Sequence, residues 1–165
     1  MKKALFLTFL FLSAISFSSE AGVKGQKLDS NSSAENRDAL PIVSRWNGGY
    51  PIAQLDQSKE RHAQLHGGYF GDEMAFASFW KDFKPGTAVP QINFSEHLVV
   101  FVRGDASYSQ MFIAKVTLKQ NTAEVVAAGN RSNSTSEDSL AMALAVIPRA
   151  GVKFIRVGGE QIAVE

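Results

Sequence analysis

The chain has 165 residues, of which 17 are basic, 16 are acidic and none is cysteine. A nearly balanced charge without a basic stripe makes nucleic acid and anionic membranes poor partners for this protein. The lack of cysteine excludes disulfides and a lipid anchor attached through an N-terminal cysteine. The folded chain must therefore be stabilised by a hydrophobic core.

The first 21 residues have the pattern of a cleavable secretory signal peptide. Lys2 and Lys3 give it a positive start, and an uncharged, strongly apolar run follows from residue 4 to residue 19. Small side chains at Ser19 and Ala21 fit the −3 and −1 positions of a cut after Ala21. A transmembrane anchor is the alternative, but it needs about 20 apolar residues, more than this run contains. We expect a periplasmic or secreted protein with no membrane anchor after cleavage.

Cleavage divides the chain into a signal peptide (1–21) and a mature chain of 144 residues, which is enough for one domain. It also removes two lysines and one glutamate, which leaves 15 basic and 15 acidic residues and no net charge. Residues 22–39 are polar and contain too few large aliphatic side chains to offset the entropy lost on ordering. We therefore expect a flexible polar leader over 22–39 and a single β-rich domain over 40–165.

Most of this domain has the two-residue hydrophobic periodicity of β-strands. Residues 97–102 (HLVVFV) are typical of a strand buried on both faces, whereas residues 112–119 alternate, with the even-numbered positions on one face. Turns are expected at Asn47-Gly48-Gly49 and Gln120-Asn121, and a tight hairpin at Gly158-Gly159. The expected strands cover residues 41–46, 50–55, 97–102, 112–119, 123–128, 140–147, 152–157 and 161–164.

One segment has helical periodicity instead. Four aromatic residues at i, i+3, i+4 and i+7 share one face of a helix, namely Phe76, Phe79, Trp80 and Phe83. Asp72 is a suitable N-cap, and Lys84-Pro85-Gly86 ends the helix. We expect this aromatic face to pack against the core. The sequence thus predicts an α+β domain, mostly antiparallel β, as a small sandwich or half-open barrel of about seven strands with one packed helix.

Two histidines are close enough in sequence for a metal site. His62 and His66 would share one face of a helical turn, but Ala63 stands where a metallopeptidase has its general-base glutamate. A structural zinc site would need four ligands at recognisable spacing. We therefore expect two solvated histidines, with no metal and no cofactor. A metal-dependent hydrolase using His62 and His66 is the less favoured alternative.

His97, Asp105 and Ser107 supply the residue types of a nucleophilic triad within a short stretch. Ser107 lacks the Gly-x-Ser-x-Gly elbow, and a triad depends on geometry rather than on proximity in sequence. Arg103-Gly104-Asp105 matches a cell-adhesion tripeptide, but Gly-Asp after a strand first indicates a turn. We expect no catalytic residue and no enzymatic activity.

Three tyrosines are candidate protein-contact residues because each closely follows glycine or another small residue: Tyr50, Tyr69 and Tyr108. Glycine-rich loops give backbone freedom, and an exposed tyrosine supplies a large amphipathic area at contact sites. The alternative for each position is a turn followed by a tyrosine in the core.

Several short features follow one another in a defined order through the domain. They are Phe79-Trp80 at the helix end, the step Pro90-x-Ile92-Asn93-Phe94-Ser95, the HLVVFV strand, Gly104, Tyr108, the strand at 112–119, Ala143–Pro148 and Val152–Phe154. This series resembles the PrcB C-terminal domain family, which is named after an accessory subunit of a spirochaete protease complex. The resemblance spans roughly residues 42–155.

The chain departs from that family at two places. Family members tend to have Thr-Gly-Gly-Tyr where this chain has Asp105-Ala106-Ser107-Tyr108, and a proline where it has Ala141-Met142. A partner contact made by that glycine loop does not carry over to this chain. The resemblance implies a non-enzymatic accessory role, in which the domain stabilises or assembles an extracytoplasmic partner such as a secreted protease.

The leading function hypothesis is an exported binding module that acts by protein–protein contact, with a protease as the partner that the resemblance implies. A chagasin-like peptidase inhibitor, whose loops plug an active cleft, is the alternative.

The export hypothesis predicts that the mature protein begins at Gly22. Intact-mass analysis of protein recovered from a Gram-negative periplasm should show the loss of residues 1–21. A full-length product retained in the membrane would overturn this prediction.

Overall fold

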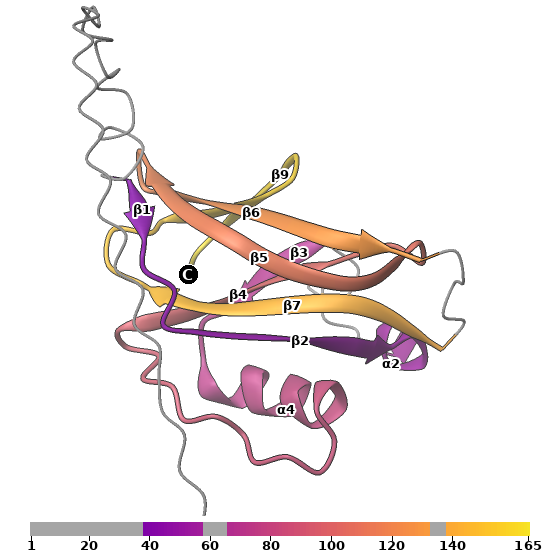
Figure 1. Cartoon of the computed structure of the whole chain (residues 1–165). Helices are drawn as coiled ribbons and strands as arrows, with labels where there is room; N and C mark the ends of the chain where they lie inside the picture. Colours follow the sequence, from indigo (N-terminus) through magenta and orange to yellow (C-terminus); the bar gives the residue numbers. More distant parts are fainter. Residues whose placement is uncertain (1–37, 58–65, 133–137) are drawn as a thin grey trace, which may run out of the picture.

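The computed structural model describes residues 38–57, 66–132 and 138–165. The predicted signal peptide, nearly all of the predicted leader and His62 lie outside the described residues. The described part holds nine strands and two helices, which form two β-sheets and a helical layer (Figure 1).

The two sheets pack face to face. Sheet A has the strand order β1-β5-β6-β8-β9, and sheet B has the order β2-β7-β4-β3. All strand pairs are antiparallel except the parallel pair of β6 and β8. The strands of sheet A are β1 (Ala39–Leu40), β5 (Tyr108–Lys119), β6 (Thr122–Arg131), β8 (Phe154–Val157) and β9 (Glu160–Ala163). Those of sheet B are β2 (Ser44–Pro51), β7 (Ser139–Pro148), β4 (His97–Arg103) and β3 (Gly67–Phe70).

Sheet A forms the upper layer in Figure 1, sheet B lies beneath it, and helix α4 (Glu73–Phe83) lies below sheet B. A short helix, α2 (Ile52–Gln57), directly follows β2. This arrangement confirms the predicted α+β sandwich with a packed helix, and the sheets do not close into a barrel. Strands β1 and β3 are additions to those expected from the sequence.

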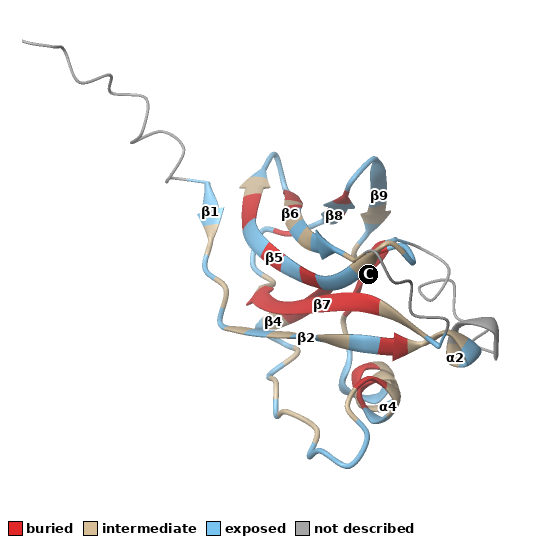
Figure 2. Ribbon diagram, turned by 45° about the vertical axis from the view of Figure 1, so that its right-hand side comes forward, coloured by how far each residue is buried: buried red, intermediate tan, exposed pale blue. Residues whose placement is uncertain are grey.

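Strand β4 is buried on both faces, as its apolar run predicts. Leu98, Val100 and Val102 point into the core between the sheets, which is called the inner core here. Val99 and Phe101 point into a second core under α4, called the helix-side core. Figure 2 shows the buried residues concentrated in β4, β7 and the face of α4 that points to the sheet. The inner core comprises Tyr69, Leu98, Val100, Val102, Met111, Ile113, Val116, Ala123, Val125, Ala141, Ala143, Ala145, Ile147, Val152, Ile155 and Val157. The helix-side core comprises Tyr50, Phe70, Phe76, Trp80, Phe83, Val99, Phe101, Met142, Leu144 and Val146.

Helix α4 has the predicted cap and the predicted buried face. The Asp72 carboxylate accepts a hydrogen bond from Ala75 N at 2.8 Å, which satisfies a donor in the first turn. Trp80 is 4 % exposed and packs edge-on to Trp46, with ring centroids 5.2 Å apart. Its indole Nε1 donates to Thr87 Oγ1 at 3.0 Å, so the buried polar atom has a partner. The burial predicted for Trp80 is confirmed.

Both predicted two-residue hairpins are present. Gln120 and Asn121 join β5 to β6 with φ values of 47° and 66°, as a primed turn requires. Gly158 has a φ of 57°, and with Gly159 it joins β8 to β9. These turns match the right-handed twist of the strands that they connect.

The turn predicted at Asn47-Gly48-Gly49 is wrong. These residues lie inside β2, which pairs with β7 along its whole length, and α2 replaces most of the strand expected at 50–55. A Cβ on Gly48 would lie 2.8 Å from Lys84 Nζ, and that ammonium donates to Asn47 O at 2.6 Å. Gly48 therefore allows the chain after α4 to pack closely against β2, and it does not mark a turn.

The alternation predicted for residues 112–119 is interrupted by a β-bulge. The register of β5 on β6 shifts between Ile113 and Lys115. Ile113 and Val116 both point into the inner core, whereas Phe112 is 41 % exposed on the outer face of sheet A. The extra residue in β5 exchanges the two faces, because side chains alternate strictly along a regular strand.

Trp80→Ala should lower the free energy of unfolding by about 3–5 kcal/mol, because it empties the space at the contact between α4 and sheet B. Urea denaturation followed by circular dichroism measures this change. Met74→Ala is the matched control, since Met74 lies on the same helix with 83 % of its surface exposed and should change stability little. Equal stability of the Trp80→Ala variant and the wild type would contradict the packing described here.

Candidate functional site

Two of the three candidate contact tyrosines are core residues. Tyr50 is 5 % exposed and stacks on Phe79, with ring centroids 4.9 Å apart. Tyr69 is 9 % exposed in β3; its hydroxyl donates to Ala163 O at 3.1 Å and accepts from Glu165 N at 3.0 Å. Burial leaves both side chains little surface for a partner, so the alternative of a tyrosine in the core describes these positions.

Tyr108 differs, because it lies half-buried at the start of β5, at one end of the sandwich. The Arg131 guanidinium sits over its ring, 5.5 Å from the centroid, in a cation–π contact. A Cβ on Gly129 would lie 2.6 Å from the Tyr108 ring, so the glycine lets the ring pack on β6. Of the three tyrosines, Tyr108 is the one that remains a candidate contact residue.

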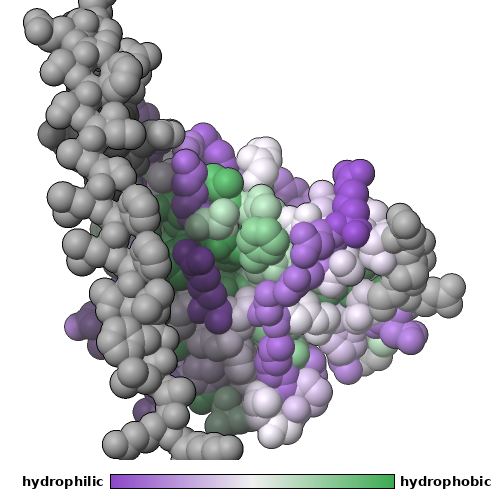
Figure 3. All heavy atoms as spheres, in the orientation of Figure 1, coloured by the Kyte–Doolittle hydropathy of each residue, from purple (hydrophilic) through white to green (hydrophobic). Residues whose placement is uncertain are grey.

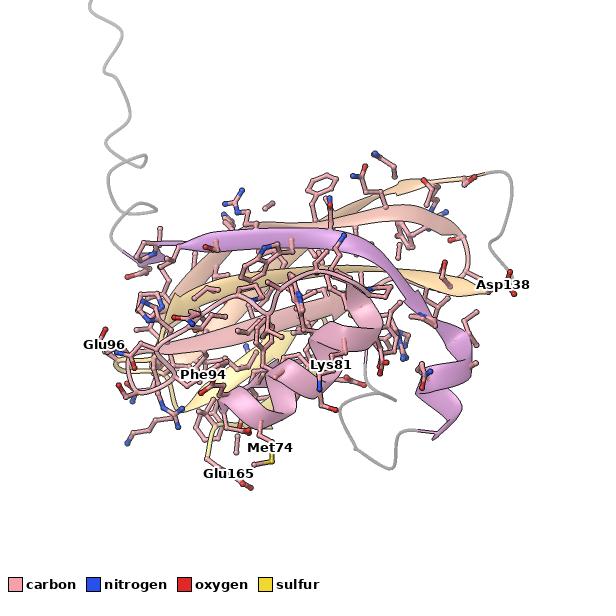
Figure 4. All side chains as sticks on the ribbon, turned by 90° about the horizontal axis from the view of Figure 1, so that it is seen from below. Met74, Lys81, Phe94, Glu96, Asp138 and Glu165 are labelled. Carbon is pink, nitrogen blue, oxygen red and sulfur yellow. The ribbon has the colours of Figure 1, made fainter. Side chains whose placement is uncertain are left out.

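The possible triad is not assembled. His97 starts β4, and Asp105 and Ser107 follow the other end of that strand. In Figure 4, Glu96 and Asp138 mark the two ends of the sandwich, and His97 directly follows Glu96. The His97 ring contacts Asn93 O at 3.3 Å through Nδ1. The length of β4 thus separates the histidine from the other two side chains.

The segment after β4 forms the expected turn. The Asp105 carboxylate accepts hydrogen bonds from the Ser107 hydroxyl and, at 2.8 Å, from Ser107 N. The Ser107 hydroxyl and then the Ser107 amide hold the pKa of Asp105 below its ordinary value of 3.8, and Arg131 and His66 contribute further attraction. The effect of Arg131 and His66 on this carboxyl places Asp105 in the electrostatic neighbourhood of both.

The described residues contain no group of three or more histidine, cysteine, aspartate or glutamate side chains that could hold a metal ion. His66 is exposed just before β3. Its predicted companion, His62, lies outside the described residues, so the geometry of that pair is not part of the described structure.

A groove of about 730 Å³ opens on one edge of the sandwich, between β6, the hairpin of β8 and β9, and the ends of β3 and β4. Its apolar floor is formed by side chains of both sheets, including Val102, Met111 and Val125. These three keep 6–7 % of their surface exposed, whereas Leu98, Ile113 and Ile155 of the same core keep 0–2 %. The groove therefore borders a slightly exposed part of the inner core.

Four charged side chains and one histidine line the same groove: Arg103, Glu124, Arg156, Glu160 and His66. Glu124 is held by two cations, Arg156 at 3.1 Å and Lys119 at 3.3 Å. Partial burial lowers the pKa of the Arg103 guanidinium, and the charge of Glu160 acts in the opposite direction.

Strand β6 borders this groove with an open edge. It pairs with β5 over its whole length, but β8 pairs only with its first four residues, Thr122–Val125. Among the described residues, no strand pairs with Val126–Arg131 on the side away from β5. This segment is called the open edge of β6 below.

The outer faces of the two sheets differ. Helix α4 covers sheet B, whereas no described element covers the outer face of sheet A (Figures 1 and 2). Phe112 and Val126 are 41 % and 42 % exposed on that uncovered face. Ala128 lies opposite Phe112 in the register of β5 and β6 and is also exposed. Figure 3 shows hydrophobic side chains exposed among hydrophilic ones over the upper layer. Phe112, Val126 and Ala128 are called the outer apolar patch below.

Neither the outer apolar patch nor the open edge of β6 was predicted from the sequence. The bulge that turns Phe112 outward has no glycine or proline to mark it. The open edge depends on where β8 stops along β6, which is a contact between segments far apart in the chain. The hydrophobic residues of β5 and β6 were visible in the sequence, but their faces were not.

Comparisons with known proteins return no match to this chain by family model, by curated sequence or by solved structure. The resemblance to the PrcB C-terminal domain family therefore stays a prediction. Within the described residues, no helix is long and apolar enough to cross a membrane.

Ser107→Ala should raise the pKa of Asp105 towards 3.8, because it removes the first of the hydrogen bonds that favour the charged carboxylate. The contribution of this turn to stability is present above pH 3.8 and is lost as the pH falls through the lower pKa of the folded state. Carboxyl carbon shifts followed by NMR from pH 2 to pH 6 measure the change. Ser109→Ala is the control, and an Asp105 titration that is identical in the wild type and in Ser107→Ala would refute the assignment.

Proposed function

We propose that this chain is an exported, non-enzymatic binding module that recognises another protein through the outer apolar patch of sheet A. The observation that carries the proposal is the unequal cover of the two sheets. Sheet B has apolar side chains on its outer face and α4 packed over them. Sheet A has Phe112 and Val126 on its outer face with no described element over them.

The outer apolar patch has the composition of an interface centre. Exposed apolar side chains are common singly, but neighbouring ones on one sheet face indicate a contact site. Phe112 and Ala128 lie directly opposite each other, and Val126 is the next residue of β6 on the same face. Aromatic residues are enriched where interfaces bury most of their binding energy.

The polar surroundings of the patch are also consistent with an interface. At one end, the exposed Asn130 side chain donates a hydrogen bond to Gln110 Oε1 at 3.3 Å, and Gln110 is the residue of β5 before Phe112 on the same face. Lys115, which lies opposite Val126 in the strand register, is exposed beside the patch. An apolar centre with a polar rim is the usual anatomy of a protein–protein interface.

The chemistry-bearing side chains support a binding role over catalysis. The triad residues lie at opposite ends of β4, and the Asp105 carboxylate is engaged by Ser107 within its own turn. The partner that the sequence resemblance implies is an extracytoplasmic protein, with a secreted protease as the first to test. A chagasin-like inhibitor is the second candidate, and the same surface would then reduce the activity of a protease.

A photo-cross-linking amino acid at position 126, expressed in the native envelope, should form one discrete adduct with a partner. The same amino acid at position 74 is the control, because Met74 is more exposed and projects from α4 on the opposite side of the molecule (Figure 4). Equal adducts from both positions would contradict a specific surface on sheet A.

The double variant Phe112→Lys/Val126→Lys should weaken binding of the cross-linked partner by at least about thirtyfold, or 2 kcal/mol, with an unchanged melting temperature. Met74→Lys should leave the affinity unchanged. If the purified partner is a protease, its activity with and without the domain separates a stabilising role from an inhibitory one. Full affinity of the double variant would exclude the outer apolar patch as the binding surface.

A further inference from the structure

We propose that an extended segment of the partner protein adds to sheet A as a further strand, along the open edge of β6 and in the groove beside it. This inference rests on the proposed function, and it adds the chemistry of the ligand: a peptide strand with apolar side chains at alternate positions and an acidic character.

The directions of the backbone groups along β6 follow from two hydrogen bonds at its ends. Phe154 N donates to Asn121 O at 3.1 Å, so Asn121 faces β8, and Ser132 N donates to Ser107 O at 2.9 Å, so Ser132 faces β5. Backbone groups of successive residues in a strand point to opposite sides. The even-numbered residues of β6 therefore bond to β5, and the odd-numbered ones point away from it.

This alternation is unbroken along β6. Both register shifts between β5 and β6 insert their extra residue into β5, where Ser109 and Ala114 have no partner in the register. Beyond the last residue paired with β8, Ala127, Gly129 and Arg131 thus direct N–H and C=O groups towards the open side. These three residues offer backbone donors and acceptors at alternate positions, which is the spacing that the main chain of an added strand needs for hydrogen bonding.

The space beside this edge fits a strand of limited length. The open edge spans six residues, Val126–Arg131, which corresponds to about 20 Å of extended chain. The turn at Gly158-Gly159 borders the groove where β8 ends. A volume of about 730 Å³ lies within the range of ligand clefts, about 300–1,000 Å³.

The apolar floor of the groove favours apolar side chains at alternate positions of the ligand. A strand added to β6 continues sheet A, so alternate side chains of the ligand point towards the inner core. There they meet Val102, Met111 and Val125, which keep 6–7 % of their surface exposed. Apolar side chains at every second position of the ligand would cover this gap, whereas the intervening side chains would face solvent.

The charges of the groove favour an acidic ligand. Its lining has two guanidinium groups, Arg103 and Arg156, against two carboxylates, and one of these carboxylates, Glu124, is also bound by Lys119. Arg131 adds a further cation at the end of the open edge, and the Asp105 carboxylate on which it acts adds an anion there, so the basic excess around the groove is small. An acidic side chain on the ligand would add to the attraction that Glu160 already exerts on the partly buried Arg103 guanidinium.

A synthetic six-residue peptide with valine or isoleucine at alternate positions, and threonine and glutamate between them, is the probe. It is added at up to millimolar concentration to the ¹⁵N-labelled chain, and amide exchange is measured by NMR. The exchange of Ala127, Gly129 and Arg131 should slow at least tenfold. Val126 and Ala128 are internal controls, because their amides are bonded to β5 already and should not change.

A matched control peptide carries N-methyl groups on alternate backbone nitrogens, which removes main-chain donors and leaves the side chains unchanged. It should leave the exchange of Ala127, Gly129 and Arg131 as fast as in the free protein. Replacing glutamate by lysine in the probe should weaken binding by about 1.4-fold to fivefold, the range for a solvent-accessible ion pair, and Arg103→Gln should reduce that difference.

Strand addition is overturned if the unmodified probe gives no protection of Ala127, Gly129 and Arg131, or if the methylated peptide protects them equally. This outcome is separate from failure of the proposed function. If Phe112→Lys/Val126→Lys loses the partner while the probe leaves the amides unprotected, the chain binds a protein by its outer face alone. If the probe protects the amides but the double variant keeps the partner, the groove is the binding site and the outer apolar patch is not.

Discussion

The fold depends on the burial of β4 and β7 on both of their faces. The two strands lie side by side at the centre of sheet B, with the inner core on one side and the helix-side core on the other. Leu98, Val99 and Val100 are each fully buried, and burying such side chains contributes about 1.5–3 kcal/mol apiece. The aromatic face of α4 is needed for this, because without it the odd-numbered residues of β4 would face water. Sheet B is therefore packed on both faces, against α4 on one side and against sheet A on the other.

In the part of the chain that the structure describes, sheet A is covered on one face only, and this asymmetry gives the molecule its two candidate binding features. The inner core fixes the inward side chains of β5 and β6, and the bulge in β5 then determines that Phe112 points outward. Because β8 is shorter than β6, the sheet also ends, among the described residues, with an open edge beside the groove. Natural sheets usually shorten, charge or cover such edges. The patch and the edge share Val126, so one partner can contact both.

The parts of the fold that could be predicted are those in which a residue's environment follows from its near neighbours. The apolar run of β4, the aromatic stripe of α4 and the Gly158-Gly159 hairpin are of this kind. Glycine and tyrosine positions were misread where the cause lies far away in the chain. A Cβ on Gly67 would lie 2.4 Å from Val157, which explains a glycine within β3 by contact between the sheets, not by a loop. Tyr69 is held by Ala163 and Glu165, and neither contact has a local signal. The candidate site is of the same kind, because it depends on how far β8 extends along β6.

The most direct test of this account is residue-resolved amide exchange in the free protein. It should show the slowest exchange in β4, from Val99 to Val102, because that strand is bonded on both edges and buried on both faces. Along β6, the amides of Ala127, Gly129 and Arg131 should exchange fast, while those of Val126 and Ala128 exchange slowly. Such alternating exchange rates along β6, together with slow exchange in β4, would show that sheet A has an open edge at β6 while the central strand of sheet B is fully bonded and buried. Uniform protection along β6, or faster exchange in β4 than in β6, would contradict the account.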